Sequence, residues 1–236
     1  MDIKGNEIIF EDDFLLVINK KPGLLVIPTP KKEKYTLLSL VNEYLQPKRE
    51  RAYPCHRLDR PTSGLIIFAK SIENQRKVMA QFREGKVEKR YLGIVQGRFR
   101  KKHLLLKGYI KPQKKSLKYA VSQINCIKSF KDFSILEIRP LTGRTNQIRI
   151  QLAGISHPLI GERKYTLAKN WPIKFKRVCL HAYYLKFRHP YSKEILSLIC
   201  ELPPDIKKFF EEKKLRVVFK QRKSLLNSVE DKGFMI

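Results

Sequence analysis

The alternation of short apolar segments with turn signals limits the possible folds of this chain more than any other feature. The apolar segments are 4–7 residues long and consist mainly of Ile, Leu, Val and Phe, which favour strands. They cover residues 7–10, 14–19, 24–27, 65–69, 89–95 and 134–139. Helical spacing predicts helices that begin after Thr36, after Ser71 and at Gly143, the last running to about Ala153. No regular β-α-β rhythm emerges, so we predict an α+β fold with a mixed, mostly antiparallel sheet and flanking helices.

The chain shows no sign of a division into separate domains. Its 236 residues contain no internal repeat and no Gly/Ser-rich linker. We therefore predict one domain over residues 1–214. Residues 215–236 lose apolar periodicity and are basic, so this tail is predicted to be helical or partly disordered.

The excess of positive charge points to a polyanionic partner. The sequence has 50 Lys and Arg against 22 Asp and Glu, a formal net charge of +28. Two stretches, Arg98–Lys118 and Arg163–Arg188, contain no acidic residue and are interleaved with aromatic residues. Such stretches suit a phosphate backbone with unstacked bases, which favours nucleic acid, and RNA over DNA. An anionic membrane surface is the alternative, but no convincing amphipathic helix and no apolar run of about 20 residues is present.

The four cysteines, Cys55, Cys126, Cys179 and Cys200, are far apart and form no C-x-x-C pair. This spacing argues against a zinc site and against a disulfide framework. A reducing compartment fits best, so we expect the protein in the cytoplasm.

Asp59 is conspicuous because it is the only acidic residue between Glu50 and Glu73 and has an arginine on each side. Guanidinium neighbours should keep such a carboxylate ionised, as a nucleophile or general base requires. A turn-capping or ion-paired aspartate is the other interpretation. A two-metal nuclease or a glycosidase would need further carboxylates, and the surrounding motif supplies none.

The segment His56–Leu65, which contains Asp59, closely resembles the signature motif of the A-type family of RNA pseudouridine synthases that modify the large ribosomal subunit. Other segments are similar to that family's motifs in the expected order. They are residues 12–20 with 23–26, 89–91, 141–149, 157–161 and 177–182. The resemblance covers about residues 6–203 and implies a pseudouridine synthase fold with a central catalytic cleft.

The resemblance implies that the chain isomerises uridine to pseudouridine in ribosomal or transfer RNA, without a cofactor or metal. Asp59 would be the catalytic carboxylate, Arg149 would pair with it, and Tyr91 would stack on the uracil and is a candidate proton relay. Substrate-binding roles are implied for Arg57, Leu180, Arg144 and Asn146. Of these, Arg57 would fill the space left by the extruded base, and Leu180 would close the apolar side of the pocket. Whether Asp59 attacks the ribose, attacks the base or removes a 2′ proton is left open.

The chain departs from the family pattern at two points. The arginine motif usually has His where this chain has Asn146, which puts an acid–base role at that position in doubt. Many relatives carry an additional N-terminal S4-type RNA-binding domain, and we expect a stand-alone catalytic domain here. RNA affinity would then come from basic surface such as Arg98–Lys118. A monomer is the default expectation, and a non-catalytic RNA-binding protein on the same fold is the rival interpretation.

Overall fold

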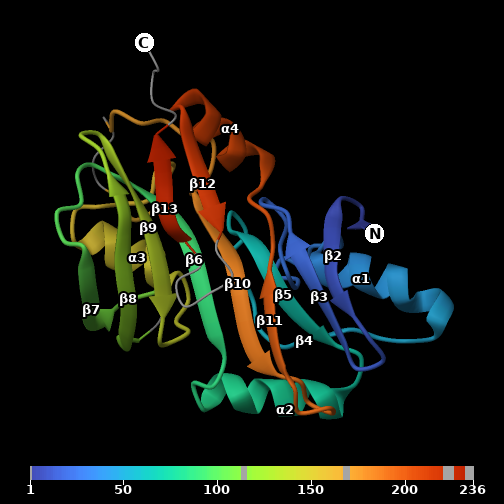
Figure 1. Ribbon diagram of the computed structural model, residues 1–236. Coiled ribbons are helices and arrows are strands. Elements are labelled where there is room, and N and C mark those ends of the chain that lie inside the picture. The colour runs from blue at the N-terminus through green and yellow to red at the C-terminus, as the bar shows by residue number, and fades with distance from the viewer. Residues whose placement is uncertain (1, 113–115, 167–170, 220–225, 232–236) are drawn as a thin grey trace. The chain divides into compact units, whose positions relative to one another are not determined.

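The computed structural model describes residues 2–112, 116–166, 171–219 and 226–231. The chain forms two compact units, each with strands and helices, which confirms the α+β class (Figure 1). Unit 1 consists of Met1–Arg90 and His181–Glu201, and unit 2 of Tyr91–Leu180 and Leu202–Ile236. The predicted domain over residues 1–214 stays a prediction. Among the described residues, no helix is both long and apolar enough to cross a membrane.

Unit 1 is built on a sheet with the strand order β1-β2-β3-β5-β10, with β4 paired to β5 and β11 paired to β10. The strands are β1 (Asp2–Ile3), β2 (Asn6–Glu11), β3 (Leu15–Lys20), β4 (Tyr53–Pro54), β5 (Ser63–Ala69), β10 (Leu180–Arg188) and β11 (Ile195–Ile199). All these pairs are antiparallel except β5 with β10, as expected for a mostly antiparallel sheet. Every residue of β5 is buried. Because β5 begins just after Asp59, the rigid centre of unit 1 positions that residue.

The two predicted helices of unit 1 are confirmed, together with their capping residues. Thr36 caps α1 (Leu37–Leu45), accepting the Ser39 N–H at 3.2 Å, while the Ser39 hydroxyl accepts the Thr36 N–H. A short 3₁₀ helix, η1 (Gln46–Lys48), follows. Ser71 caps α2 (Ile72–Arg83) by accepting the Asn74 N–H at 3.1 Å.

The predicted strand over residues 24–27 is wrong, because these residues form no strand. The backbone carbonyls of Leu25 and Val26 instead accept the N–H groups of Leu37 and Leu38 at 2.7 and 3.0 Å. Those donors belong to the first turn of α1, where backbone N–H groups lack partners within the helix. The segment therefore caps a helix instead of joining the sheet.

Unit 2 contains a second run of antiparallel strands in the order β6-β9-β8-β7. They are β6 (Glu88–Gln96), β7 (His103–Ile110), β8 (Lys118–Ser129) and β9 (Phe133–Pro140). The helices are α3 (Gln147–Gly154) and α4 (Pro204–Glu212). Phe209 of α4 packs edge-on against Phe133 of β9, with ring centroids 5.3 Å apart. The Gln151 side chain of α3 donates to the carbonyls of Leu106 and Ala120 at 3.0 and 3.2 Å, which holds α3 against β7 and β8.

The described part of the C-terminal tail is extended, so the expectation of a helical tail is wrong there. β12 (Leu215–Phe219) and β13 (Leu226–Asp231) pair antiparallel. The run Val217-Val218-Phe219 is β-branched and aromatic, which favours a strand. Residues 220–225 and 232–236 of the predicted tail lie outside the described residues.

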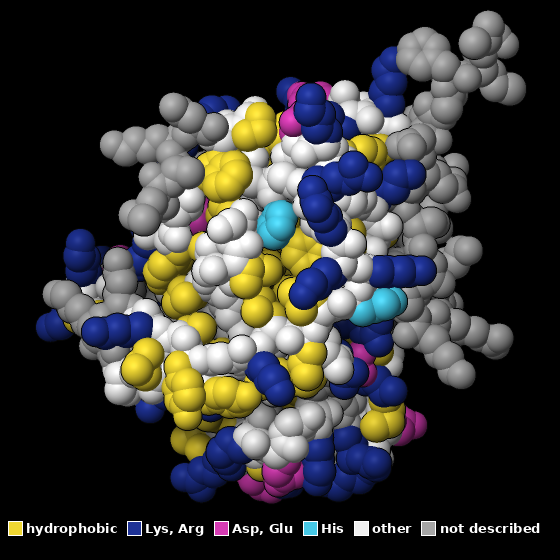
Figure 2. All heavy atoms as spheres, turned by 90° about the vertical axis from the view of Figure 1, so that its left-hand side faces the viewer, with side chains coloured by type: hydrophobic (Ala, Val, Ile, Leu, Met, Phe, Trp, Pro, Cys, Tyr) yellow, Lys and Arg dark blue, Asp and Glu magenta, His cyan; other side chains and the backbone are white. Residues whose placement is uncertain are grey.

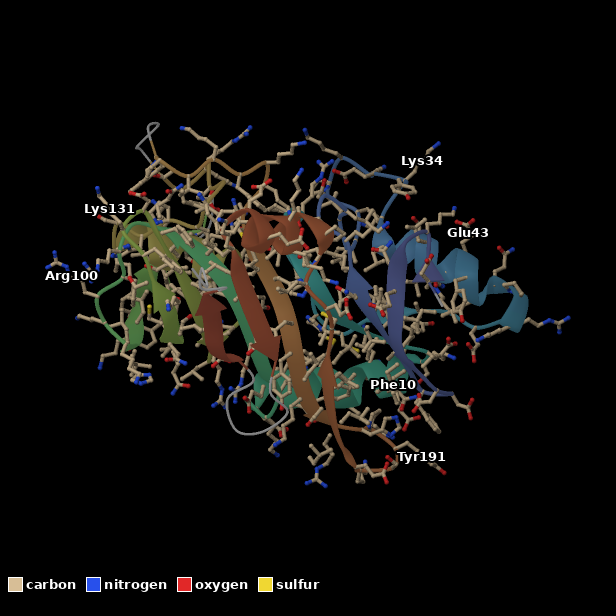
Figure 3. All side chains as sticks on the ribbon, turned by 45° about the horizontal axis from the view of Figure 1, so that its top comes forward. Phe10, Lys34, Glu43, Arg100, Lys131 and Tyr191 are labelled. Carbon is tan, nitrogen blue, oxygen red and sulfur yellow. The ribbon has the colours of Figure 1, made fainter. Side chains whose placement is uncertain are left out.

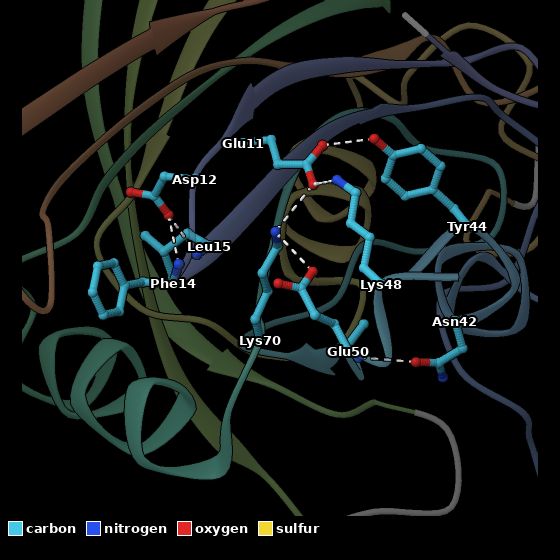
Figure 4. A network of polar contacts seen from close by, with 10 residues as sticks. Glu11, Asp12, Phe14, Leu15, Asn42, Tyr44, Lys48, Glu50 and Lys70 are labelled. Carbon is cyan, nitrogen blue, oxygen red and sulfur yellow. Dashed lines mark hydrogen bonds and ion pairs between the residues drawn. The ribbon is translucent and has the colours of Figure 1, made fainter. Parts of the chain in front are cut away.

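A network of charged groups joins β2, α1 and the end of β5 in unit 1 (Figure 4). The Glu11 carboxylate accepts hydrogen bonds from Tyr44 at 2.8 Å, Lys48 at 2.7 Å and Lys70 at 3.0 Å. Lys70 also pairs with Glu50 at 2.9 Å. Burial raises the pKa of Glu11, but the three donors outweigh it and lower the pKa to about 2.

This network should make the stability of the protein depend on acid pH. The pKa of Glu11 lies near 4.5 when it is free of these partners and at about 2 in the fold. Its contribution is therefore complete above about pH 4.5 and is lost as the pH falls towards 2. Urea unfolding across this range should show a shallower acid loss of unfolding free energy in Glu11→Gln than in the wild type. Glu43→Gln, which removes an exposed pair with Lys4, is the control and should keep the wild-type slope; equal slopes for all three proteins would contradict the prediction.

Candidate active site

Unit 1 holds Asp59 in a tight turn between β4 and β5. The Thr62 N–H donates to the Asp59 carbonyl at 3.0 Å and closes a four-residue turn. Asp59 is half-buried, the neighbouring Leu58 is buried and Arg57 is exposed. The buried Leu58 side chain thus anchors the motif, while Arg57 stays accessible to solvent.

A buried lysine that the sequence interpretation missed secures this turn. Lys20, at the end of β3, has no solvent exposure, and its ammonium group donates to the carbonyls of Lys21 at 2.8 Å, Leu24 at 2.9 Å and Arg60 at 3.3 Å. Gly23 and Arg60 exchange two further hydrogen bonds, N–H to carbonyl at 2.8 Å and Nε to carbonyl at 2.9 Å. The segment around Lys20 and Gly23 therefore holds the turn that contains Asp59 in place. The one feature of the sequence that could have indicated this buried lysine is its position at the end of an apolar strand pattern.

The glycine of the motif is required by close backbone packing. Gly64 has φ +115°, and a Cβ atom there would clash with the backbone of Ala182. Gly64 and Ala182 are partners in the parallel pairing of β5 with β10. Only glycine both adopts this φ and permits the approach, so Gly64 allows β5 to pair closely with β10 just after the Asp59 turn.

His56 is a structural hydrogen-bond acceptor. Its Nε2 accepts the backbone N–H of Ile67 in β5 at 3.0 Å. Burial, together with the nearby charge of Lys89, lowers the pKa of His56 to about 3, so the ring is neutral at pH 7. A neutral ring whose Nε2 is occupied by a backbone donor shapes the loop, and this disfavours His56 as a general base.

In unit 2, Arg149 is held by a buried carboxylate. Arg149 of α3 donates from Nε to Glu162 Oε2 at 2.7 Å and from Nη2 to Oε1 at 2.9 Å, a two-pronged ion pair. The side chains of Arg149 and Glu162 are 8% and 0% exposed. Burial raises the pKa of Glu162, but the hydrogen bonds from Arg149 and from the backbone lower it overall. The guanidinium also lies 5.1 Å from the centre of the Tyr165 ring. The Glu162 carboxylate and the Tyr165 ring therefore fix the orientation of the Arg149 guanidinium.

The backbone conformation at Asn146 accounts for where α3 begins and for why Asn can stand where the family motif usually has His. Its backbone lies in the left-handed region, with φ 54° and ψ 23°, so the helix begins at Gln147 and not at Gly143 as predicted. Asn and His are both enriched in this conformation, which makes the exchange of one for the other sterically mild. The Asn146 side-chain oxygen accepts from Arg149 Nη1 at 2.9 Å. Asn146 thus positions Arg149 without needing a titratable ring.

The remaining predicted residues of unit 2 lie on its strands and loops. Tyr91 is buried on β6, opposite Ile138 of β9. Leu180 is buried where β10 begins, and Arg144 is exposed in the loop before α3. Unit 2 thus carries Tyr91, Arg144, Asn146, Arg149 and Leu180, while unit 1 carries Arg57 and Asp59. The pairing of Asp59 with Arg149 stays a prediction.

Known proteins are similar to this chain over most of its length. A family model described as RNA pseudouridylate synthase matches residues 14–154. Ribosomal large subunit pseudouridine synthase D of Zymomonas mobilis is 32% identical over 232 residues, which cover 87% of this chain and 72% of that protein. Dual-specificity RNA pseudouridine synthase RluA of Pasteurella multocida is 32% identical over 203 residues, 81% of this chain and 90% of that protein.

A solved structure agrees with these sequence matches. Human RNA pseudouridylate synthase domain containing 4 superposes with a TM-score of 0.71 at 25% identity, covering 86% of this chain and 91% of the human one. Together with the matched region, which includes Asp59, Tyr91 and Arg149, these relatives show that the chain belongs to the RNA pseudouridine synthase family. It is an isomerase that acts on uridines of RNA.

Proposed function

We propose that this chain converts uridine to pseudouridine in ribosomal RNA with Asp59 as the catalytic carboxylate. The observation that carries the proposal is the set of hydrogen bonds that Lys20 and Gly23 form with Arg60. These bonds fix the turn that contains Asp59. A catalytic group must be held within a narrow range of positions, and a turn fixed by a fully buried ammonium group provides that. An aspartate that only capped a turn would not need such support.

The reaction rearranges bonds within one nucleotide. The bond between N1 of uracil and C1′ of the ribose breaks, the base turns, and C5 bonds to C1′. The proton on C5 passes to solvent and N1 ends protonated, so atoms and charge balance. Asp59 takes part by attacking the ribose, by attacking the base or by removing the proton from C2′ of the ribose to form a glycal intermediate. All three routes use an ionised carboxylate close to an extruded base.

The other residues have supporting roles in this proposal. Arg149 pairs with Asp59, Tyr91 stacks on the uracil, and Leu180 closes the apolar side of the pocket. Arg57, exposed beside Asp59, enters the space that the flipped uridine leaves, where a planar guanidinium can stack and donate hydrogen bonds. Arg144 and Asn146 contact the substrate strand.

The basic surface of unit 2 suits an RNA backbone. Arg100 and Lys131 are exposed and project away from the strands of unit 2 (Figure 3). Most of the acid-free stretches Arg98–Lys118 and Arg163–Arg188 is described, but residues 113–115 and 167–170 lie outside the described residues. Each phosphate that such cations neutralise releases a counterion, so binding should weaken as salt rises.

Ribosomal RNA is the proposed substrate because several relatives are named for the ribosomal large subunit. Transfer RNA is the second candidate, since one relative is named dual-specificity. All four cysteines are free, which fits a reducing compartment such as the cytoplasm. The monomeric state stays a prediction.

The substrate class can be tested by tritium release. Large-subunit ribosomal RNA and bulk transfer RNA, both made with 5-tritiated uridine and free of natural modification, are incubated with the enzyme. We expect release from ribosomal RNA up to a fixed small number of sites per molecule, and much slower release from transfer RNA. Faster release from transfer RNA would reverse the assignment, and binding to both RNAs without release would favour the non-catalytic RNA-binding interpretation.

A further inference from the structure

Two tyrosine rings are exposed side by side on the hairpin formed by β7 and β8. Tyr109 is 72% exposed and Tyr119 is 44% exposed. They are direct partners in the antiparallel register, and their rings meet edge to face with centroids 5.3 Å apart. Each ring thus keeps its position through the other while offering a face to solvent. Exposed aromatic rings that support each other in this way are suited to receive a further flat ring.

The surroundings of the pair are positively charged. Lys107 of β7, Lys118 of β8 and Lys111, which directly follows β7, are exposed and lie within two residues of a tyrosine of the pair in sequence. The sequence has no acidic residue from Arg98 to Lys131, which includes the whole hairpin. On the side of unit 2 that carries β7 and β8, Lys and Arg side chains stand beside hydrophobic ones (Figure 2). This combination complements a strand of phosphates and unstacked bases better than it complements an apolar protein surface.

The hairpin is joined by hydrogen bonds to the loop that leads into α3. Arg144 Nε donates to the Tyr119 carbonyl at 3.0 Å. The Val121 N–H donates to the Thr142 hydroxyl at 3.0 Å, and the Gln147 side chain donates to the Val121 carbonyl at 3.0 Å. The tyrosine pair is therefore fixed to the same segment that carries Arg149, so an RNA strand that contacts Arg144 can continue onto the rings.

We propose that Tyr109 and Tyr119 form a stacking site for unpaired nucleobases of the substrate RNA that flank the target uridine. The flanking assignment rests on the proposed function, whereas the stacking site itself does not. Stacking does not read base identity, because every base has a flat aromatic face. The site would hold an unpaired segment open and so lower the cost of extruding the target base.

The test uses a single-stranded oligocytidine RNA of about 12 nucleotides, within the range that single-strand-binding surfaces cover. It contains no uridine, so the outcome is independent of catalysis. Tyr109→Leu with Tyr119→Leu should raise Kd for this RNA roughly 5- to 100-fold, the range that loss of base stacking produces. Tyr109→Phe with Tyr119→Phe keeps the rings and should bind like the wild type. Tyr35→Leu, at a tyrosine that is 63% exposed in unit 1, should also leave Kd unchanged.

An abasic strand of the same length distinguishes stacking from charge. It keeps the phosphates, so the Leu variants should bind it like the wild type, with the same dependence of Kd on salt. Lys107→Gln should instead flatten the salt dependence on both strands. Wild-type affinity of the Leu variants for oligocytidine, or an equal loss on the abasic strand, would overturn the proposal. The proposal would also be overturned if the Leu variants changed the oligomeric state, measured by sedimentation, without changing the affinity for RNA. The tyrosines would then belong to a protein interface.

The single variant Tyr109→Leu keeps the test valid if the double variant folds poorly. Its ring is mostly in solvent, so its removal should leave thermal unfolding nearly unchanged. It should still weaken oligocytidine binding several-fold. If all Leu variants bind normally while tritium release from ribosomal RNA proceeds, the stacking site is wrong and the proposed activity stands.

Discussion

Replacement of Asp59 by asparagine is expected to lower the rate of pseudouridine formation by at least about 10³-fold. The amide keeps the size of the side chain but cannot act as an anionic nucleophile or base. The turn should persist, because the variant keeps the backbone hydrogen bond from Thr62 to Asp59 and the bonds of Lys20 and Gly23 with Arg60. Tritium release from 5-tritiated uridine in ribosomal RNA, measured under single-turnover conditions, gives the rate.

The same measurement separates a catalytic role from a role in folding or binding. Asp59→Asn should bind ribosomal RNA within about threefold of the wild-type affinity, because RNA binding depends chiefly on the basic surface. Glu84→Gln makes the same chemical change at an exposed helix end and should release tritium at the wild-type rate. Release by Asp59→Asn at a rate close to that of Glu84→Gln would remove Asp59 from the mechanism.

Replacement of Glu162 by alanine should have the second large effect, on stability and activity together. It leaves the guanidinium of Arg149 buried without its carboxylate partner, and breaking a buried pair costs about 3–5 kcal/mol. For a chain of this size that lowers Tm by roughly 6–20 °C. We also expect kcat to fall by about 10²-fold with little change in RNA affinity, because Arg149 loses its fixed orientation. Thermal unfolding and tritium release measure the two effects.

Two further variants distinguish positioning by Glu162 from general stabilisation. Glu73→Ala removes an exposed pair with Lys77, worth about 0–1 kcal/mol, and should leave both Tm and activity nearly unchanged. Arg149→Met with Glu162→Leu replaces the ion pair by apolar groups and should regain much of the stability without regaining activity. If this double variant recovered activity as well, neither Arg149 nor its positioning by Glu162 would matter for catalysis.

Much of the secondary structure could be predicted because its causes are local. Thr36 and Ser71 cap helices through N–H groups three residues away, and both helices begin where expected. The strand in β5 follows from a continuous apolar run. Residues 24–27 were misassigned because their carbonyls bond to α1 and to Lys20, partners that no local pattern identifies. The start of α3 was misplaced because the left-handed backbone at Asn146 leaves no signal in apolar spacing.

The candidate site likewise has residues that the sequence predicts and residues that it does not. Asp59 stands out by charge, and the order of motifs around it indicates the family. The buried partners were not predicted: Lys20 reaches Arg60 across 40 residues, and Glu162 reaches Arg149 across 13. In sequence both resemble ordinary surface charges, because burial depends on the packing of segments that are distant along the chain.

The sequence by itself determined the α+β class, the isomerase family and the residues proposed for catalysis, since each depends on which side chains occur and in what order. Only the tertiary structure decided which contacts fix the positions of those side chains. Buried charges such as Lys20 and Glu162 are stable only where folding brings carbonyls or a guanidinium within hydrogen-bonding distance. The same is true of the tyrosine pair, because Tyr109 and Tyr119 become neighbours only through the register of β7 with β8.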